Sequence, residues 1–151
     1  MKGDIMIKTE NLTIRPYLFS DYDDLYEILS NTEAVKYELY DTLTYEECKE
    51  ETMVRAICGE FFAVCLGEKM IGSIYYGNSD YGLELGFIFN PNYWHKGYAY
   101  EAVKAFLDMV KDKKITARCF RENLASSRLL KKLGFVLVND DDIQTYLLIK
   151  N

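Results

Sequence analysis

One stretch constrains the fold more than any other, because it runs from an apolar strand through a polar turn into a helix; it spans residues 83–102. Apolar residues between Ala99 and Val110 recur every three or four positions, which predicts a helix with one apolar face. Its first turn starts near Lys96 or Gly97, where backbone N–H groups have no intrahelical acceptor and the helix dipole is positive. Since Gly97 places no side chain before these groups, the turn predicts an anion-binding site.

Composition limits the classes of protein that the chain can represent. Its 151 residues, 49% hydrophobic and 28% charged, suit one globular domain over residues 1–151. Because no apolar run approaches eighteen residues and the polar segment Met1–Asp4 leads directly into a strand-like pattern, we expect no transmembrane helix, no signal peptide, no membrane partner and a cytoplasmic location.

Charge and cysteine spacing exclude two further classes of function. A net charge of −6 disfavours nucleic acid as a partner and mildly favours cationic partners. With a single histidine and no C-x-x-C pair, a metal site is not expected. The cysteines instead resemble small, reduced core residues: Cys48, Cys58, Cys65 and Cys119.

Hydrophobic periodicity and turn signals predict the remaining elements. A first strand over residues 12–17 pairs with residues 5–7, and a capping-box pattern beginning at Ser20 opens a helix that buries Leu25, Ile28 and Leu29. A short helical turn follows near residues 32–37. A second capping box at Thr44 and Glu47 and a left-handed cap at Gly59 delimit the next helix.

The second half of the chain alternates strands and helices. Three consecutive antiparallel strands are expected over residues 61–66, 70–76 and 81–89. The helix from residue 99 to 110 then leads to a strand over 115–119, which implies a parallel pair. A helix capped by Asn123 and ending at Gly134, and a terminal hairpin over residues 135–149, complete an α/β (α+β) arrangement.

Two segments carry a resemblance to a known family. The run Tyr93-Trp94-His95-Lys96-Gly97-Tyr98-Ala99-Tyr100-Glu101-Ala102 looks like the pyrophosphate-binding segment of the GNAT acyltransferase superfamily, in which a Gln or Arg precedes x-x-Gly-x-Gly/Ala. Residues 123–135 are similar to its second signature. The resemblance covers nearly the whole chain and is greatest to the Rim-type ribosomal-protein N-terminal acetyltransferases. Trp94 departs from the family's Gln or Arg, and Tyr100 from the branch's frequent Thr.

This resemblance implies a fold and a cofactor. The fold is a mixed, mostly antiparallel sheet of about six or seven strands with helices on both faces. Two parallel strands splay apart to receive acetyl-CoA, whose pantetheine arm hydrogen-bonds the free edge at Phe87, Ile88 and Phe89 as an added strand would. Main-chain amides of the turn hold the diphosphate: His95, Lys96, Gly97, Tyr98, Ala99 and Tyr100.

Transfer of an acetyl group to an amine requires an oxyanion donor and a base. The N–H group of Phe87 or Ile88 is the candidate donor, freed by a bulge in the strand. Glu84 is the candidate base, since it shares a strand face with Gly86 and Ile88, opposite the apolar Leu83 and Leu85. The alternative is that Glu84 faces solvent and has no catalytic role.

The last helix departs from the family where a general acid is expected. Leu130 stands where many members have a tyrosine, so we assign Ser126 to hold the thiol or a water; its alternative is an ordinary first-turn residue. Asn123 either caps the helix or bonds the pantetheine amide, and both roles compete for one oxygen. Lys131, with Lys132, is a candidate for the nucleotide phosphate, although exposed helix lysines usually face only water.

The acceptor site is expected in the segment between the first two helices, where Tyr37 and Tyr40 accompany acidic residues suited to a cationic acceptor. These tyrosines equally suit a loop packed on the sheet. An α-amine, with a pKa near 7.8, is roughly a tenth neutral at pH 7, whereas deprotonating a lysine takes ~3.5 kcal/mol more. One carboxylate base therefore favours an α-amine.

We accordingly predict an acetyl-CoA-dependent N-acetyltransferase that acts on a protein N-terminus or a small amine, as a monomer or homodimer. Transfer is direct, within a ternary complex, because neither Cys65 nor Cys119 matches a nucleophile position. The alternatives are a non-catalytic acyl-CoA-binding sensor, favoured by Leu130, and a domain without a CoA site.

Overall fold

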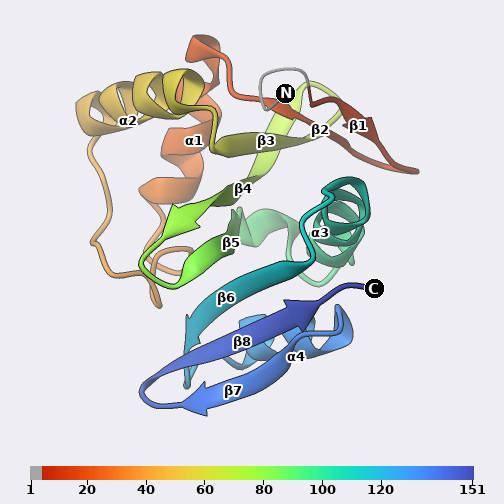
Figure 1. The fold of residues 1–151 in the computed structure, drawn as a ribbon. Coiled ribbons are helices and arrows are strands. Elements are labelled where there is room, and N and C mark those ends of the chain that lie inside the picture. The colour runs from red at the N-terminus through yellow and green to blue at the C-terminus, as the bar shows by residue number, and fades with distance from the viewer. Residues whose placement is uncertain (1–4) are drawn as a thin grey trace.

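The computed structural model describes residues 5–151, so the Met1–Asp4 segment used in the signal-peptide prediction lies outside the described residues. Eight strands form one sheet in the order β1-β2-β3-β4-β5-β6-β8-β7 (Figure 1). The strands are β1 (Ile7–Lys8), β2 (Thr13–Pro16), β3 (Phe61–Leu66), β4 (Lys69–Ser79), β5 (Gly82–Phe89), β6 (Lys114–Phe120), β7 (Val136–Asp140) and β8 (Ile143–Ile149). Only β5 and β6 pair in parallel. The predicted class is confirmed, and the strand count slightly exceeds six or seven.

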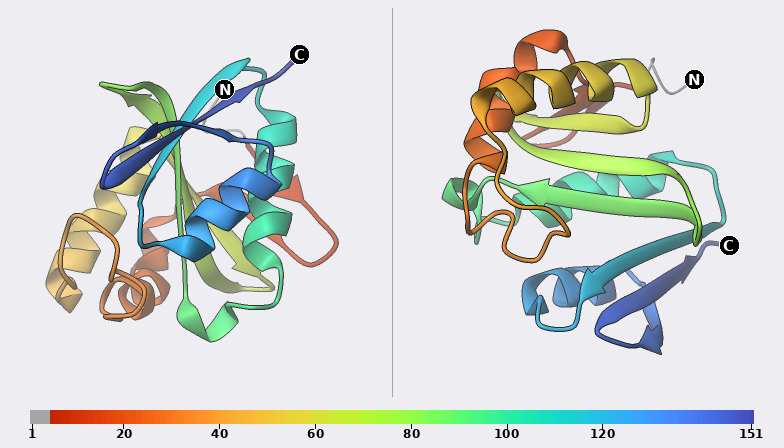
Figure 2. Two further views of the ribbon diagram at one scale, coloured as in Figure 1. Left: turned by 90° about the horizontal axis from the view of Figure 1, so that it is seen from below. Right: turned by 90° about the vertical axis from the view of Figure 1, so that its left-hand side faces the viewer.

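Four helices cover the sheet, two on each face. They are α1 (Tyr22–Leu29), α2 (Tyr45–Cys58), α3 (Tyr98–Met109) and α4 (Leu124–Lys132), with short 3-10 turns η2 (Phe19–Asp21) and η3 (Pro91–Tyr93). Figure 2 shows α1 and α2 on one face and α3 and α4 on the other. Among residues 5–151, no helix combines the length and apolar character that a membrane crossing requires.

Each face of the sheet has its own core, and β3 contributes to both. Its Phe62 and Val64 pack into the core beneath α3, whereas Ala63 and Cys65 pack beneath α1 and α2. Because successive side chains of a strand point to opposite faces, a strand buried on both sides reads as a continuous apolar run. This explains the uninterrupted Phe61–Leu66 sequence.

The helix caps agree with the sequence in α2 but not in α1. Thr44 Oγ1 accepts the Glu47 N–H at 3.2 Å, Glu47 accepts the Thr44 N–H at 2.8 Å, and Gly59 is left-handed with φ 74°. The predicted Ser20 cap of α1 is wrong. Asp21 precedes the helix, and its carboxylate accepts the Leu18 N–H at 2.7 Å and both guanidinium N–H groups of Arg15.

The parallel strands β5 and β6 diverge soon after they pair. Their register contains only Glu84 opposite Thr116 and Leu85 opposite Ala117, although β5 continues to Phe89 and β6 to Phe120. The predicted bulge in β5 is wrong, since its register with β4 is continuous from Gly82 to Phe89. The free edge of β5 arises because β6 turns away from it.

Candidate active site

The turn between β5 and α3 is held by local hydrogen bonds. Asn90, which is fully buried, accepts the Asn92 N–H at 3.0 Å and so begins η3. The Trp94 indole N–H donates to the Phe89 carbonyl at 2.9 Å. Trp94 therefore ties the turn to the end of β5, which is a structural role that requires no contact with a ligand.

The same turn alternates into left-handed conformations. His95 has φ 63°, the one positive value for a non-glycine residue in the described chain, and Gly97 has φ 82°. Such alternation directs successive N–H groups into one concavity, a common anion-binding arrangement. A Cβ atom added at Gly97 would meet nothing within 4 Å, so the space before these groups is open.

Helix α3 adds its own donors to this concavity. Its first backbone bond runs from the Glu101 N–H to the Gly97 carbonyl at 3.0 Å. The N–H groups of Tyr98, Ala99 and Tyr100 therefore precede the intrahelical bonds and carry the positive end of the helix dipole. The turn from residue 95 to 100 has the geometry of a phosphate site.

Glu101 places a carboxylate in the first turn of α3, but its charge is engaged elsewhere. It accepts hydrogen bonds from the Thr9 hydroxyl at 2.5 Å, the Asn11 N–H at 2.8 Å and the Asn11 amide at 2.9 Å. Burial raises the pKa of Glu101, and these hydrogen bonds outweigh it, so the net pKa is lowered. The carboxylate braces the turn against the β1–β2 connection.

Two lysines of α4 lie near this region, in different directions. The Lys132 ammonium lies 4.2 Å from the centre of the Tyr100 ring, which places a positive charge beside the first turn of α3. The charge of Lys131 instead acts on Cys119 and Asp140. Lys132 is therefore the lysine in contact with the turn.

Helix α4 begins shortly after the end of β6. The Asn123 side-chain oxygen accepts the Ser126 N–H at 3.2 Å, so the cap occupies that oxygen and the amide NH₂ is the group available to a ligand. Ser126 is half-buried. Leu130 is 1% exposed within the core, so its position supplies no acid.

Glu84 lies where β5 and β6 part, on the face covered by α1 and α2. Arg118 of β6 donates to its carboxylate at 3.2 Å through Nε, and the guanidinium carbon lies 4.0 Å from the centre of the Tyr81 ring. The Glu84 side chain is only 14% exposed. Arg118 and Tyr81 also line a hollow of about 610 Å³ that extends to the turn of residues 139–142.

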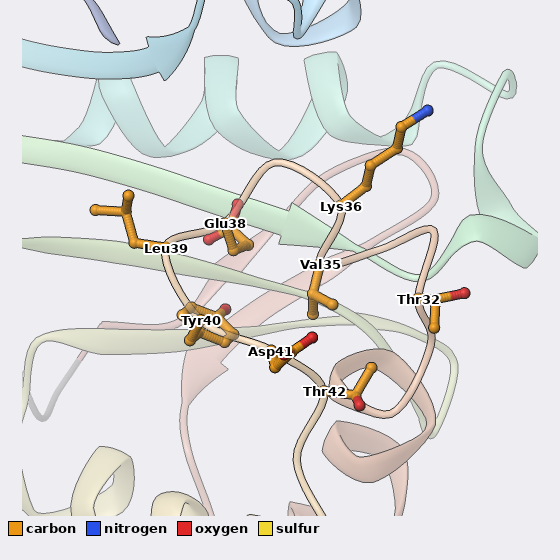
Figure 3. Close-up of a pocket in the computed structure, with 8 residues that line it drawn as sticks. All are labelled: Thr32, Val35, Lys36, Glu38, Leu39, Tyr40, Asp41 and Thr42. Carbon is orange, nitrogen blue, oxygen red and sulfur yellow. The ribbon is translucent and has the colours of Figure 1, made fainter.

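The connection between α1 and α2, residues 30–44, forms a second wall on this face. The helical turn predicted near residues 32–37 is a series of hydrogen-bonded turns instead. A hollow of about 400 Å³ is lined by this connection from Thr32 to Thr42 (Figure 3). Tyr40, 41% exposed, lines it, whereas Tyr37 is half-buried and does not.

The site contains titratable groups but no metal-binding cluster. Within residues 5–151, no group of three or more His, Cys, Asp or Glu side chains could hold a metal ion.

A sequence-family profile described as "Acetyltransferase (GNAT) domain" matches residues 11–136. This chain is a GNAT acetyltransferase. The phosphate turn and the splayed strands both lie within the matched residues.

Relatives agree in sequence and in fold. The "Uncharacterized N-acetyltransferase YnaD" of Bacillus subtilis is 36% identical over 139 residues, covering 85% of this chain and 81% of that protein. An acetyltransferase of the GNAT family from Bacillus anthracis has a TM-score of 0.87 at 27% identity, covering 96% of this chain and 98% of that one. The ribosomal L7/L12 α-N-protein acetyltransferase RimL, solved with coenzyme A, has a TM-score of 0.82 at 14% identity, covering 97% and 98%. The resemblance to the Rim-type fold is thus confirmed, and the family favours an enzyme over a non-catalytic sensor.

Sequence reasoning missed two side chains of this GNAT acetyltransferase and did not distinguish a third from its neighbours. Arg118 was read only as part of a strand, although its alternate position on β6 places it on the face of Glu84. Arg55 donates to Glu51 one turn earlier on α2, a spacing that the sequence does display. Glu38 was included only as one of the acidic residues beside Tyr37 and Tyr40, because the charge that distinguishes it, that of Arg55, comes from α2.

Proposed function

We propose that this enzyme transfers an acetyl group from acetyl-CoA to a primary amine, either a protein N-terminal α-amine or a small amine. One observation supports this most: the concave turn of residues 95–100 opens beside the strand edge that β6 leaves free. Backbone N–H groups suit a diphosphate, and a free strand edge suits the amide-containing pantetheine arm.

The donor-binding residues follow from this arrangement. His95, Lys96, Gly97, Tyr98, Ala99 and Tyr100 hold the diphosphate, chiefly through main-chain N–H groups. Phe87, Ile88 and Phe89 bond the pantetheine arm, and the Asn123 amide donates to it. Lys132 supports the phosphate region through Tyr100, with Lys131 as the further candidate.

The acceptor approaches β5 on the face that carries Glu84. Acetyl-CoA supplies an acetyl group activated as a thioester; its carbon–sulfur bond breaks as the new carbon–nitrogen bond forms. The N–H group of Phe87 or Ile88 donates to the carbonyl oxygen. We assign Glu84 to accept the proton that the ammonium loses, with Ser126 positioning the thiol or a water, and Tyr37 and Tyr40 beside the acceptor.

Transfer is direct, without an acetyl-enzyme. Burial raises the pKa of the Cys119 thiol to about 11, and Cys48 and Cys65 are buried, so none is an activated nucleophile. Incubation with labelled acetyl-CoA alone leaves the protein unlabelled; a stable adduct contradicts direct transfer. Free thiols also fit a cytoplasmic enzyme, which we propose as a single domain acting as monomer or homodimer.

CoA release is measured over free N-terminal peptides, polyamines and aminoglycosides, with binding followed by thermal shift. Turnover with one class supports the proposal. CoA binding without turnover indicates a sensor. If CoA does not raise the melting temperature, the proposed donor site is wrong. Glu84→Gln lowers turnover at neutral pH and recovers part of it at high pH, whereas an unchanged profile removes the Glu84 assignment.

A further inference from the structure

The proposed function gives no role to Glu38, an acidic side chain on the acceptor side. Glu38 is half-buried at the rim of the 400 Å³ hollow and interacts with the Tyr40 hydroxyl. Figure 3 shows the Lys36 ammonium directed away from both. A carboxylate and an aromatic face side by side match the chemistry of an ammonium group.

Arg55 connects this pair of side chains to β5. Its guanidinium, 7% exposed, donates to the Tyr17 hydroxyl and to Ser73 Oγ, each at 3.2 Å, and to Glu51 at 2.7 Å. Ser73 lies opposite Ile88 in the antiparallel register. The charge of Arg55 also acts on Glu38 and Tyr40. Glu38 therefore lies near the end of β5 where the oxyanion donor is proposed.

Two carboxylates thus flank the reacting part of β5. Ile88 and Glu84 share one strand face and lie about 13 Å apart along it. Between them, Gly86 presents no side chain, and a Cβ atom added there would meet only Tyr75, in ordinary van der Waals contact. Arg118 pairs with Glu84 at one end. At the other end, Arg55 hydrogen-bonds Ser73 opposite Ile88, and its charge acts on Glu38.

We infer that Glu38 binds the acceptor as its ammonium ion and positions it over β5 before transfer, a role that rests on the proposed function and differs from proton removal by Glu84. Tyr40 supplies the aromatic face of the same subsite. The acceptor class is accordingly a primary amine that binds in its charged form, not a neutral hydroxyl compound.

The electrostatics of Glu38 agree with this role. Burial raises its pKa, while the Tyr40 hydroxyl and the Arg55 charge lower it by less. The groups around it are Tyr40, Lys36 and Asp41 of the loop and Arg55 of α2. Burial removes water from a carboxylate and destabilises its charged form, and a cation that pairs with the carboxylate stabilises that form again. Acceptor binding therefore weakens as the pH falls through the Glu38 pKa.

The test measures KM and kcat for the amine acceptor separately, in the wild type and in variants. Its probe is whichever amine the wild type acetylates best among spermidine, a peptide with a free N-terminus and an aminoglycoside. Glu38→Gln raises the KM for this amine at least tenfold, lowers kcat less than threefold, and removes the fall in acceptor affinity at low pH. Tyr40→Leu, which removes the aromatic face, raises KM about two- to fivefold. Glu33→Gln, an exposed residue of the same connection, changes neither parameter.

Thermal shift with CoA serves as the folding control, since Glu38 lies outside the donor site. An unchanged KM in a Glu38→Gln variant that CoA still stabilises overturns the inference and leaves the proposed function intact. An effect confined to kcat also overturns it, because it assigns proton transfer to Glu38. If wild-type protein turns over no amine, both proposals fail together.

Discussion

The two sides of β5 are built from different kinds of atoms. On the side where we propose that the acetyl donor binds, called the donor side, the turn of residues 95–100 and the free edge of β5 offer backbone groups, and the fold itself aligns them. On the acceptor side, side chains of four separate elements meet, among them Glu38, Arg55 and Ser73. A site built from backbone groups keeps its ligand contacts when side chains are substituted. A site built from side chains loses or alters contacts with each substitution.

The largest expected effect tests the main-chain character of the donor side. Gly97→Val places a β-branched residue at positive φ and shifts the N–H groups, so CoA affinity falls on the order of 100-fold, roughly 3 kcal/mol. Gly67→Val is the matched control, because Gly67 also has positive φ and open surroundings. Calorimetric CoA titration should separate the two, and equal affinities would contradict the donor turn.

The second effect falls on the acceptor side and concerns stability. Arg55→Met removes hydrogen bonds to Tyr17, Ser73 and Glu51 and lowers the free energy of unfolding by about 2 kcal/mol. Urea denaturation measures it, with the exposed Arg128→Met as control. CoA affinity stays unchanged; a parallel loss of CoA binding would show that the two sides are coupled.

A smaller effect on CoA affinity distinguishes the two lysines of α4. Lys132→Met removes the cation beside Tyr100 and weakens CoA binding about two- to fivefold, close to 0.5–1 kcal/mol, while Lys131→Met has less effect. The loss shrinks as salt rises, because the lysine is exposed. A drop approaching that of Gly97→Val would mean that side chains, not the backbone, dominate the donor side.

The smallest effect is a pH dependence of stability. Since the folded-state pKa of Glu38 is raised, its contribution to stability is complete below the unfolded pKa and is lost as pH rises through the folded pKa. Glu38→Gln therefore slightly stabilises the protein at neutral pH, and this gain disappears as the pH falls below the Glu38 pKa. Thermal unfolding from pH 3 to 8 checks the sign, and a gain that grows at low pH refutes it.

Sequence reasoning succeeded where local signals set the structure. Gly97 and the periodic residues of α3 predicted the turn into that helix, and Thr44 with Glu47 predicted the cap of α2, because each acts on its own neighbours. The uninterrupted apolar run of β3 predicted a buried strand for the same reason. The prediction failed at Ser20, because Asp21 of the same motif pairs with Arg15 and accepts the Leu18 N–H, and Arg15 lies outside the motif.

The acceptor side could not be predicted in the same way. Arg55 hydrogen-bonds Tyr17, 38 residues away in the sequence, and Ser73, 18 residues away. No sequence pattern predicts contacts at these separations. The bulge expected at Phe87 was wrong because the free edge depends on β6, a strand placed by α3 and β8. Tertiary contacts decide both outcomes.

The bond between Glu101 and the segment of Thr9 and Asn11 joins positions 92 and 90 residues apart. During synthesis, a nascent chain cannot brace its phosphate turn until α3 has left the ribosome and met the first strands. Removing those strands, or splitting the gene between them and α3, would leave residues 95–100 without this brace, and we expect the fragment not to bind CoA. Fragment complementation, monitored by recovered CoA binding, would reveal this dependence.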